Sequence, residues 1–338
     1  MNTMRRPLSL VFNPLKLLRQ PAWPHPTAIA PKLDLSQPVE EKNSPYYDPL
    51  YFYPARLGEV LHNRYQLVNK LGHGSRATVW LAKDLHRWRW LEEKYVAVKI
   101  NSNHDTRKFS GDSEINILRH ISTANPRHIG WHFTRHLLDT FLVQNPTSKK
   151  PHACLVFEPL RESLGRYCRR WEDGVMPPEI FRIVLQIILQ ALDYLHSECH
   201  IIHTAVRGDG PVNHDGCIQA EVYRAPEVVL DKGYSYSADI WSLGVMLWDF
   251  LEGRTLFQDV DPLHVEEYYD EQHLALITAL LGPPPKDLLD KGKRTSMFYK
   301  SDGTLQNPSL IPEDFTFQNT ICNMSGEWKR RFINFVQR

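Results

Sequence analysis

The spacing of apolar and polar residues predicts that the first half of the chain is built on short strands. Runs rich in β-branched and aromatic residues at 65–68, 78–82 and 95–100 have the composition of strands, and a short apolar run at 154–157 predicts a fourth, buried strand. The charged and aromatic stretch 84–94 is expected to connect the second and third runs as a hairpin. Together these elements predict a small sheet.

Helical spacing appears once beside this sheet and then dominates the second half. Three apolar residues share one side of 114–121, and in 179–199 apolar residues fall at i, i+3, i+4 and i+7, the stripe of a core helix. Segment 239–251 is apolar nearly all round and predicts a buried helix, and 271–281 predicts another that ends at Gly282. A small β-rich part followed by a larger α-rich part predicts an α+β fold.

The first 45 residues have a different composition. Basic residues interleave with leucines, no acid precedes Asp34, and four prolines fall between residues 21 and 31. Such a segment is similar to a mitochondrial transit peptide, and the alternative is a disordered leader. We therefore expect residues 1–45 to be a disordered or targeting leader, with folded structure beginning near Tyr46.

Composition narrows the function classes. The 338 residues are 42% hydrophobic and 23% charged, and the formal net charge is +1, which argues against a broad nucleic-acid-binding face. The longest apolar stretch, around 183–192, is broken by glutamines and is expected to be too short to span a membrane. The cysteines are odd in number and contain no C-x-x-C pair, so a disulfide framework or zinc site is not expected, and an intracellular compartment fits best. They are Cys154, Cys168, Cys199, Cys217 and Cys322.

A glycine pair lies between the first two predicted strands, where Gly72 and Gly74 follow Leu71. Glycines at such a turn let backbone N–H groups approach phosphate oxygens closely. About twenty residues later Lys99 lies in the third predicted strand, and Glu114 on the next helix could form the ion pair that orients it. Taken alone, the glycines also fit a hairpin turn, and the pair also fits a surface salt bridge.

Two later motifs narrow the class of protein further. The run Ala225-Pro226-Glu227 matches the A-P-E element of protein kinases. The run 237–244, with Asp239 and Trp241, matches the start of the buried kinase helix, whose aspartate braces the catalytic loop. The occurrence of four separate motifs in this order argues against a chance similarity.

The chain thus resembles the eukaryotic protein kinases and, within them, the serine/arginine-protein kinases in a form typical of fungal sequences. The closer match depends on four runs, which are 53–59, 78–81, 202–204 with His203, and 234–241. The resemblance implies a bilobal kinase fold. It would place an N-lobe with ATP-binding elements and hinge at 46–160 and an incomplete C-lobe at 161–338.

The resemblance also implies site residues and partners. Val79 and Ala97 would sandwich the adenine of ATP, Phe157 would be the gatekeeper, and the hinge would run from Glu158 to Leu160. Such kinases transfer the phosphoryl group of ATP, with Mg²⁺, to Ser or Thr of proteins, here Arg-Ser-rich splicing factors. We further expect a monomer that binds no nucleic acid or membrane directly. Its location would be cytoplasmic and nuclear, or mitochondrial if the leader acts as a targeting signal.

The residues that carry out phosphoryl transfer are missing. The catalytic aspartate should follow His203 and Thr204, but Ala205 stands there, and neither the metal-binding asparagine nor a D-F-G run follows. Only about twenty residues separate Ala205 from the A-P-E run, roughly half of what an intact kinase needs. We hypothesise one excision between Thr204 and Ala205. No catalytic residue and no metal ligand is then retained.

The end of the chain is also short for a kinase. The late helix at its end is normally followed by another, which carries an arginine that pairs with Glu227, so this glutamate is expected to lack its partner. Three alternatives stay open. The chain is an incomplete version of an active kinase, from mis-predicted splicing or a truncated allele; it is a pseudokinase that binds nucleotide or a partner as a scaffold; or it does not fold stably.

Overall fold

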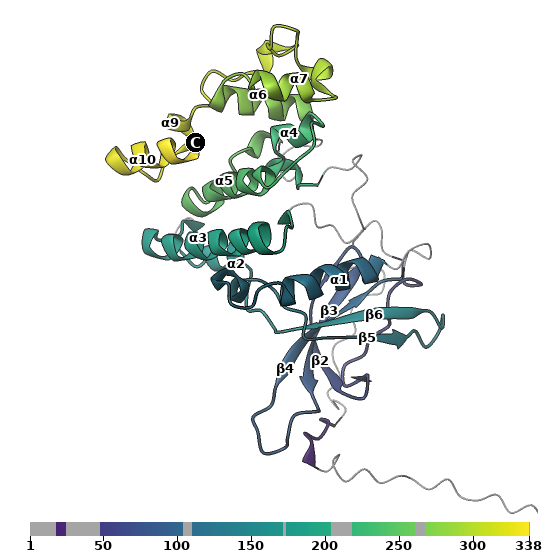
Figure 1. Ribbon diagram of the computed structural model, residues 1–338. Helices are drawn as coiled ribbons and strands as arrows, with labels where there is room; N and C mark the ends of the chain where they lie inside the picture. The colour runs from purple at the N-terminus through teal and green to yellow at the C-terminus, as the bar shows by residue number, and fades with distance from the viewer. Residues whose placement is uncertain are drawn as a thin grey trace, which may run out of the picture. The chain divides into compact units, whose positions relative to one another are not determined.

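The chain forms two compact units. The computed structural model describes residues 18–24, 48–103, 110–171, 174–203, 218–260 and 268–337. Unit 1 comprises Met1–Arg119 and Arg135–Leu160, and unit 2 comprises His120–Thr134 and Arg161–Arg338. Strands belong to unit 1 and most helices to unit 2, so the mixed α+β content expected from the sequence is confirmed (Figure 1).

Unit 1 is built on a six-stranded sheet in the order β1-β2-β3-β4-β6-β5, in which every neighbouring pair is antiparallel. The four predicted strands are present and longer than expected, whereas β1 and β5 were not predicted. The strands are β1 (Val60–Leu61), β2 (Tyr65–Gly74), β3 (Ala77–Asp84), β4 (Tyr95–Asn101), β5 (Asp139–Gln144) and β6 (Pro151–Phe157). Helix α1 (Ser110–Thr123) follows β4.

The alternation of side chains along β4 gives the sheet two different faces. Val96, Val98 and Ile100 enter the main core of unit 1, which also contains Tyr65 and Phe141. The residues between them face the other side, where Ala97 packs in a second, smaller cluster. The period of two therefore leaves the second face of the sheet available for the candidate site.

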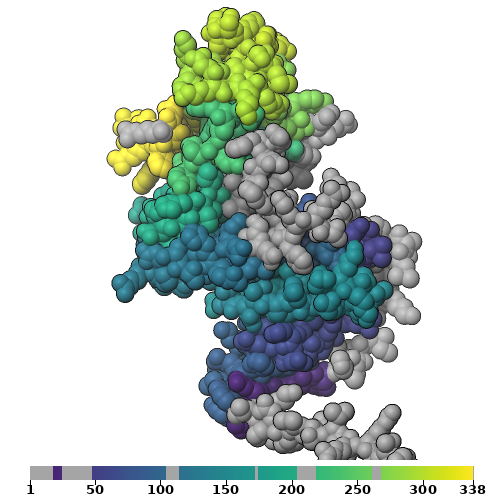
Figure 2. All heavy atoms as spheres, turned by 45° about the vertical axis from the view of Figure 1, so that its right-hand side comes forward, coloured from purple at the N-terminus to yellow at the C-terminus, as the bar shows by residue number. Residues whose placement is uncertain are grey.

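Part of the N-terminal leader is folded onto unit 1, so the expectation that all of residues 1–45 lie outside the fold is wrong for 18–24. The backbone of this segment bonds to the connection between β3 and β4, through Gln20 N–H to Arg87 O (2.8 Å) and Arg89 N–H to Leu18 O (2.9 Å). Figure 2 shows its purple atoms against the blue atoms of the sheet region. We call residues 18–24 the N-terminal strap.

Trp23 anchors the strap. Its backbone N–H donates to Gln66 Oε1 (2.7 Å), and Gln66 Nε2 donates back to its carbonyl (2.9 Å). The indole lies 5.2 Å from the ammonium of Lys83 and donates to Glu93. Lys83 is 1% exposed and pairs with Glu93 at 2.6 Å. Hydrogen bonds from Lys83 and then Tyr95 lower the pKa of Glu93 to about 2. A leader composition carries no signal for such contacts, which depend on side chains more than forty positions away.

Unit 2 is helical. Its longest predicted helices occupy the segments expected from periodicity, with ends that shift by one or two residues once the π-helical turn Tyr194–Glu198 is counted with α3. The helices are α2 (Leu164–Cys168), α3 (Pro178–Asp193), α4 (Pro226–Val229), α5 (Ser237–Leu251), α6 (Asp270–Leu281), α7 (Lys286–Lys291), α8 (Thr295–Phe298), α9 (Phe317–Thr320) and α10 (Gly326–Val336). Gly282 ends α6 with φ 80°, a conformation that favours glycine.

Helix α5 is the centre of unit 2. Eight of its fifteen residues are buried, including Leu247 and Trp248, as expected from an apolar sequence all round. Trp248 packs against Phe317 of α9 and Phe332 of α10. The predicted buried helix is therefore confirmed at 239–251.

Helix α3 differs from its prediction as a core helix, because none of its residues is fully buried. One side, with Leu185, Ile188 and Leu192, packs on the α5 core cluster, whereas Ile183 is 55% exposed. With the π-helical turn that continues it, the stretch Pro178–Glu198 has 21 residues, enough by length and composition to cross a membrane. The glutamines do not interrupt the helix, so the expectation that this stretch is too short was wrong. Its contacts with the α5 cluster are those of a helix packed within unit 2.

Candidate functional site

The register of the sheet aligns the residues that the sequence singled out in unit 1. Gly72 of β2 lies opposite Val79 of β3, and Val79 lies opposite Lys99 of β4. Ala97, two positions before Lys99, lies opposite Phe157 of β6. Since residues two apart on a strand share a face, Val79, Ala97 and Lys99 belong to one side of the sheet.

Lys99 is paired with the helix that follows its strand. Its Nζ lies 2.5 Å from Oε1 of Glu114 on α1, and the two side chains are 29% and 21% exposed. Asn101 Nδ2 donates to the other carboxylate oxygen of Glu114 at 3.0 Å. Both oxygens of Glu114 are therefore occupied, which fixes the direction of the lysine. This arrangement is more ordered than a surface salt bridge, the alternative reading of the sequence.

The small cluster beside Lys99 brings together three further predicted residues. Ala97 and Phe157 are 1% and 2% exposed, and Val79 packs against them. The guanidinium of Arg135 lies 4.1 Å from the centre of the Phe157 ring. Sequence reasoning did not single out Arg135, because it lies between the predicted elements and matches no motif.

The two glycines of β2 have no structural reason of their own to be glycine. Neither has a positive φ, and a Cβ at either position would meet no atom within 4 Å. Leu71, which precedes them, is 48% exposed. Space above Gly72 and Gly74 is what close approach of a ligand to the backbone requires.

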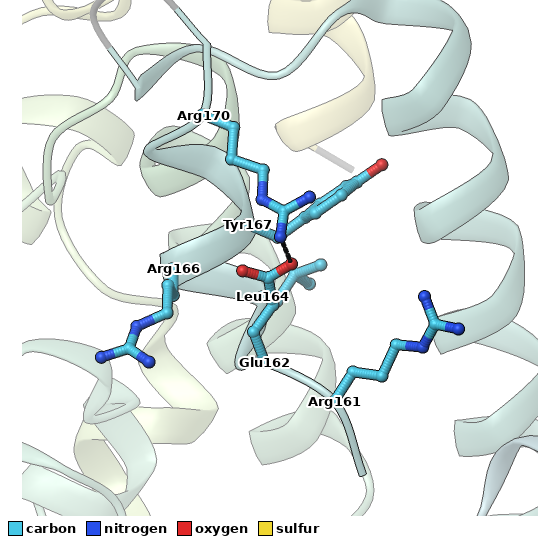
Figure 3. A pocket seen from close by; sticks show the side chains of 6 residues that line it. All are labelled: Arg161, Glu162, Leu164, Arg166, Tyr167 and Arg170. Carbon is cyan, nitrogen blue, oxygen red and sulfur yellow. Dashed lines mark ion pairs between the residues drawn. The ribbon is translucent and has the colours of Figure 1, made fainter.

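The predicted hinge, from Glu158 to Leu160, follows β6 without regular structure, and Leu160 is 68% exposed. A cavity of about 550 Å³ lies just after it in the sequence, within unit 2. Figure 3 shows its Arg170 pointing toward Glu162, with the Arg161 side chain extended apart from them. The ion pair between Arg170 and Glu162 has an N–O distance of 2.5 Å. The lining has three arginines and one acid. In the sequence, this group of arginines is the feature that could have indicated the cavity, but the sequence analysis did not use it. The cavity is lined by Arg161, Glu162, Leu164, Arg166, Tyr167 and Arg170.

In unit 2, Asp239 of α5, which was expected to brace the catalytic loop, is hydrogen-bonded to the segment that ends at His203. Asp239 is 3% exposed, and its Oδ2 accepts hydrogen bonds from the backbone N–H of His203 and from Nε2 of His196, both at 2.8 Å. His196 also stacks on Tyr236, with ring centres 4.4 Å apart. Thr204 and Ala205 lie outside the described residues.

The A-P-E run lies at the start of α4. Ala225 is fully buried and its N–H donates to Gln219 Oε1 at 2.8 Å, while Pro226 occupies the first helical position. Glu227 is half-buried and accepts a hydrogen bond from Ser237 Oγ at 3.0 Å. In the described part of the chain no arginine pairs with Glu227, but partial exposure and this hydrogen bond reduce the cost of an unpaired charge.

Trp241 lies one turn after the start of α5 and is held by packing, not by hydrogen bonds. Its indole nitrogen is buried and finds no hydrogen-bond partner among the described residues. The ring packs against the α5 core cluster. Its position in the structure is therefore that of a packing residue.

Across the described ranges no three His, Cys, Asp or Glu side chains come close enough to hold a metal ion. The cysteines in those ranges are free thiols, and three of them are buried. In unit 1, the Lys99 ammonium and the open space beside Gly72 and Gly74 have the chemistry that phosphate groups require.

Comparison with known proteins identifies the family. The protein kinase domain family matches residues 211–303. A serine/threonine protein kinase of Aspergillus fumigatus is 30% identical over 375 aligned positions, which cover 96% of this chain and 92% of that protein. The serine/threonine-protein kinase SRPK of Physarum polycephalum is 26% identical, covering 79% of this chain and 78% of that protein. Human dual specificity tyrosine-phosphorylation-regulated kinase 3 is 30% identical, covering 71% and 41%.

The sheet with its Lys99–Glu114 pair, and the helices with the A-P-E run and Asp239, are features of a protein kinase domain. The chain belongs to the serine/threonine protein kinase family. This family consists of transferases that use ATP.

Proposed function

We propose that this chain is a nucleotide-binding member of the serine/threonine kinases, of the serine/arginine-kinase type, that does not transfer the phosphoryl group efficiently. The observation that carries the proposal is the ordered Lys99–Glu114 pair in register with Gly72 and Val79. These residues would hold ATP. Lys99 would contact its phosphates, the Gly72–Gly74 backbone would lie close to them, and Val79 and Ala97 would pack on its adenine.

The proposed loss of phosphoryl transfer is supported by the chain itself. Kinase catalysis requires positioning and charge neutralisation by an aspartate, an asparagine and the D-F-G aspartate. Ala205 replaces the first, and the sequence between it and Ala225 contains neither of the others in a kinase motif. Asp209 and Asp215 are in that interval, outside the described residues. ATP would supply a phosphoryl group here, but no residue is assigned to move it.

The alignment with the Aspergillus fumigatus kinase supports a missing segment. It has 375 positions, and 96% of 338 residues is about 324, so about 50 positions of the alignment contain no residue of this chain. We therefore retain an excision at Thr204–Ala205 as part of the proposal. Sequencing transcripts across that junction tests it. A transcript that encodes His-Thr-Asp and a D-F-G run would identify this chain as an incomplete version of an active kinase.

Nucleotide binding is tested by titrating the purified chain with ATP, with and without Mg²⁺, and following its thermal unfolding. We expect ATP to raise the melting temperature, because a ligand that binds only the folded state stabilises it. Lys99→Ala should abolish the rise, whereas Lys286→Ala, at an exposed position on α7, should not. The absence of any rise in the unchanged chain would overturn nucleotide binding.

Phosphoryl transfer is tested separately with an Arg-Ser-rich peptide and labelled ATP. We expect incorporation no greater than that of Lys99→Ala. Incorporation that depends on Lys99 would refute the proposed impairment. The Arg-Ser-rich partner belongs to this proposal and is supported by the similarity to the Physarum polycephalum SRPK. The proposal also includes a monomeric state and a cytoplasmic and nuclear location, or a mitochondrial one if the leader acts as a targeting signal. A non-catalytic scaffold role is the second candidate. These two experiments would favour it if the chain binds ATP but transfers no phosphoryl group.

A further inference from the structure

The cavity of unit 2 that follows the hinge in the sequence carries more positive charge than its lining balances. Three arginines and one acid line its volume of about 550 Å³. Arg170 is ion-paired with Glu162, whereas the side chains of Arg161 and Arg166 are exposed and have no ion pair or hydrogen bond with any described residue. This balance is that of the described lining, since Glu172 and Asp173 come next in the sequence and lie outside the described residues.

Arg170 is oriented before any ligand arrives. Its guanidinium lies 2.5 Å from Oε1 of Glu162 and 5.6 Å from the ring centre of Tyr167. Tyr167 in turn packs edge-on against Trp171, with ring centres 4.6 Å apart. An arginine that is already oriented loses less side-chain freedom when it binds a ligand. The cavity therefore has one oriented guanidinium, and Arg161 and Arg166 are free to turn toward a ligand (Figure 3).

The wall of the cavity is anchored in the core of unit 2. Leu164 lines the cavity and also packs against the buried cluster formed by Cys168, Met176 and Phe250. Ser163 caps α2, because its Oγ accepts the backbone N–H of Arg166 at 3.3 Å. The cavity is therefore built on a short helix that is part of the folded unit.

We propose that this cavity binds a phosphorylated segment of a partner protein. A guanidinium presents its N–H groups in a planar fork that matches two phosphate oxygens, and a phosphoserine carries roughly −1.5 to −2 charges at pH 7. The two unpaired arginines offer the opposite charge in the same amount. The volume is typical of ligand pockets and exceeds what one phosphate group needs. Apolar residues beside the phosphoserine would pack on Leu164 and Tyr167.

A phosphopeptide fits the cavity better than a nucleic acid does. Proteins bind single strands along a positively charged groove that follows the backbone, with aromatic side chains under successive bases. This cavity is lined by one aromatic side chain, Tyr167, and its lining includes the carboxylate of Glu162. One phosphoserine can contact the arginines without approaching that carboxylate, whereas a run of phosphates cannot.

The inference is independent of nucleotide binding, because the residues that line the cavity all belong to unit 2 and the proposed nucleotide residues to unit 1. It also goes beyond the proposed Arg-Ser-rich partner. Arginines of an unphosphorylated Arg-Ser-rich segment would be repelled by the arginines of the cavity. The lining therefore selects for phosphate and against such a segment.

Fluorescence anisotropy of the full chain with a labelled peptide that carries one phosphoserine between leucines tests the proposal. We expect this peptide to bind roughly tenfold or more tightly than its unphosphorylated form. Arg161→Ala with Arg166→Ala should weaken its binding roughly tenfold. Lysine at both positions should weaken it roughly threefold, because an ammonium keeps the charge but loses the planar fork.

Two controls separate this site from other effects. Arg330→Ala with Arg331→Ala on α10 also removes two exposed arginines of unit 2 and should bind the phosphopeptide like the unchanged chain. Lys99→Ala should do the same, so a failure of nucleotide binding and a failure of this proposal are distinguishable. Equal melting temperatures of variant and unchanged chain exclude unfolding as the cause of a loss.

Four outcomes would overturn the proposal. The first is equal binding of the phosphorylated and unphosphorylated peptides. The second is a loss no larger in the Arg161 and Arg166 variant than in the Arg330 and Arg331 variant, which would assign binding to net charge alone. The third is displacement of the peptide by inorganic phosphate at the peptide's own concentration, which would indicate a site for a free anion. The fourth is tighter binding of a labelled single-stranded RNA that the same two changes weaken.

Discussion

Asp239 holds the backbone of His203: its buried carboxylate accepts the N–H of that residue at 2.8 Å, across 36 positions of sequence. The same oxygen accepts a hydrogen bond from Nε2 of His196. One acid on α5 thus fixes two points of the segment that leads toward the expected catalytic loop. This tether is present although Ala205 stands where the sequence analysis expects the catalytic aspartate.

Replacing Asp239 tests how much this tether stabilises unit 2. Asp239→Ala would leave two buried donors without their acceptor, which should reduce the free energy of unfolding by roughly 2–4 kcal/mol. Urea unfolding followed by circular dichroism measures it. Asp290→Ala, at an exposed site on α7, should change stability by less than about 0.5 kcal/mol. Equal effects of the two changes would contradict the tether.

Gly130 allows the 3₁₀ helix Ile129–Phe133 to pack closely on α3. A Cβ there would lie 1.9 Å from the carbonyl oxygen of Gln190 and 2.7 Å from Cβ of Tyr194. Gly130→Ala should therefore lower the stability of unit 2 by about 2 kcal/mol or more, because backbone must move. At Gly165 of α2 a Cβ meets nothing within 4 Å, so Gly165→Ala should be neutral or slightly stabilising. Thermal unfolding of both variants measures the difference; similar melting temperatures would refute the close packing.

The strap should protect the bond after Arg19 from trypsin. Trp23→Ala removes the indole that covers Lys83 and donates to Glu93, which should cost roughly 1–2 kcal/mol of docking free energy. Cleavage between Arg19 and Gln20 should then become about tenfold faster. Mass spectrometry of a digestion series detects it, with Trp328→Ala as control. Rapid cleavage at this bond in the unchanged chain would show that the strap is not docked.

His273 should make unit 2 sensitive to mild acid. It is fully buried, and burial lowers its pKa from 6.5 to about 3, so the unfolded chain binds a proton below pH 6.5 that the folded chain does not. The contribution of neutral His273 to the free energy of unfolding is therefore complete above pH 6.5 and declines as the pH falls toward 3. Between pH 7 and 5.5 the free energy of unfolding should fall by about 1 kcal/mol.

A matched pair of variants isolates this contribution. His273→Gln keeps a partner for the hydroxyl of Tyr268, which contacts His273 Nδ1 at 2.8 Å, and should flatten the decline. His132→Gln, at an exposed position, should not alter it. Urea unfolding at both pH values gives the slopes. An unchanged slope in His273→Gln would contradict the assignment.

Much of the candidate site was predictable because its residues lie in short, strongly patterned segments. The alternation Val96, Val98, Ile100 fixed the face of β4, and therefore the side on which Ala97 and Lys99 emerge. Helical spacing around Glu114 placed it on the next element. Arg135 could not be predicted, because it matches no motif or period and its contact, Phe157, lies more than twenty positions away. The arginines of the cavity lie within ten residues of one another, and the sequence analysis did not use them because they match no motif.

The sequence by itself indicated the family and the order of strands and helices, and it contains no D-F-G run, since these depend on residue identity and local periodicity. Only the tertiary structure decided that Glu114 reaches Lys99, that α3 leaves much of its apolar surface exposed, and that residues 18–24 join unit 1 rather than the leader. Such features arise from contacts between positions far apart in the chain. Their free energies depend on burial and geometry, which no local pattern encodes.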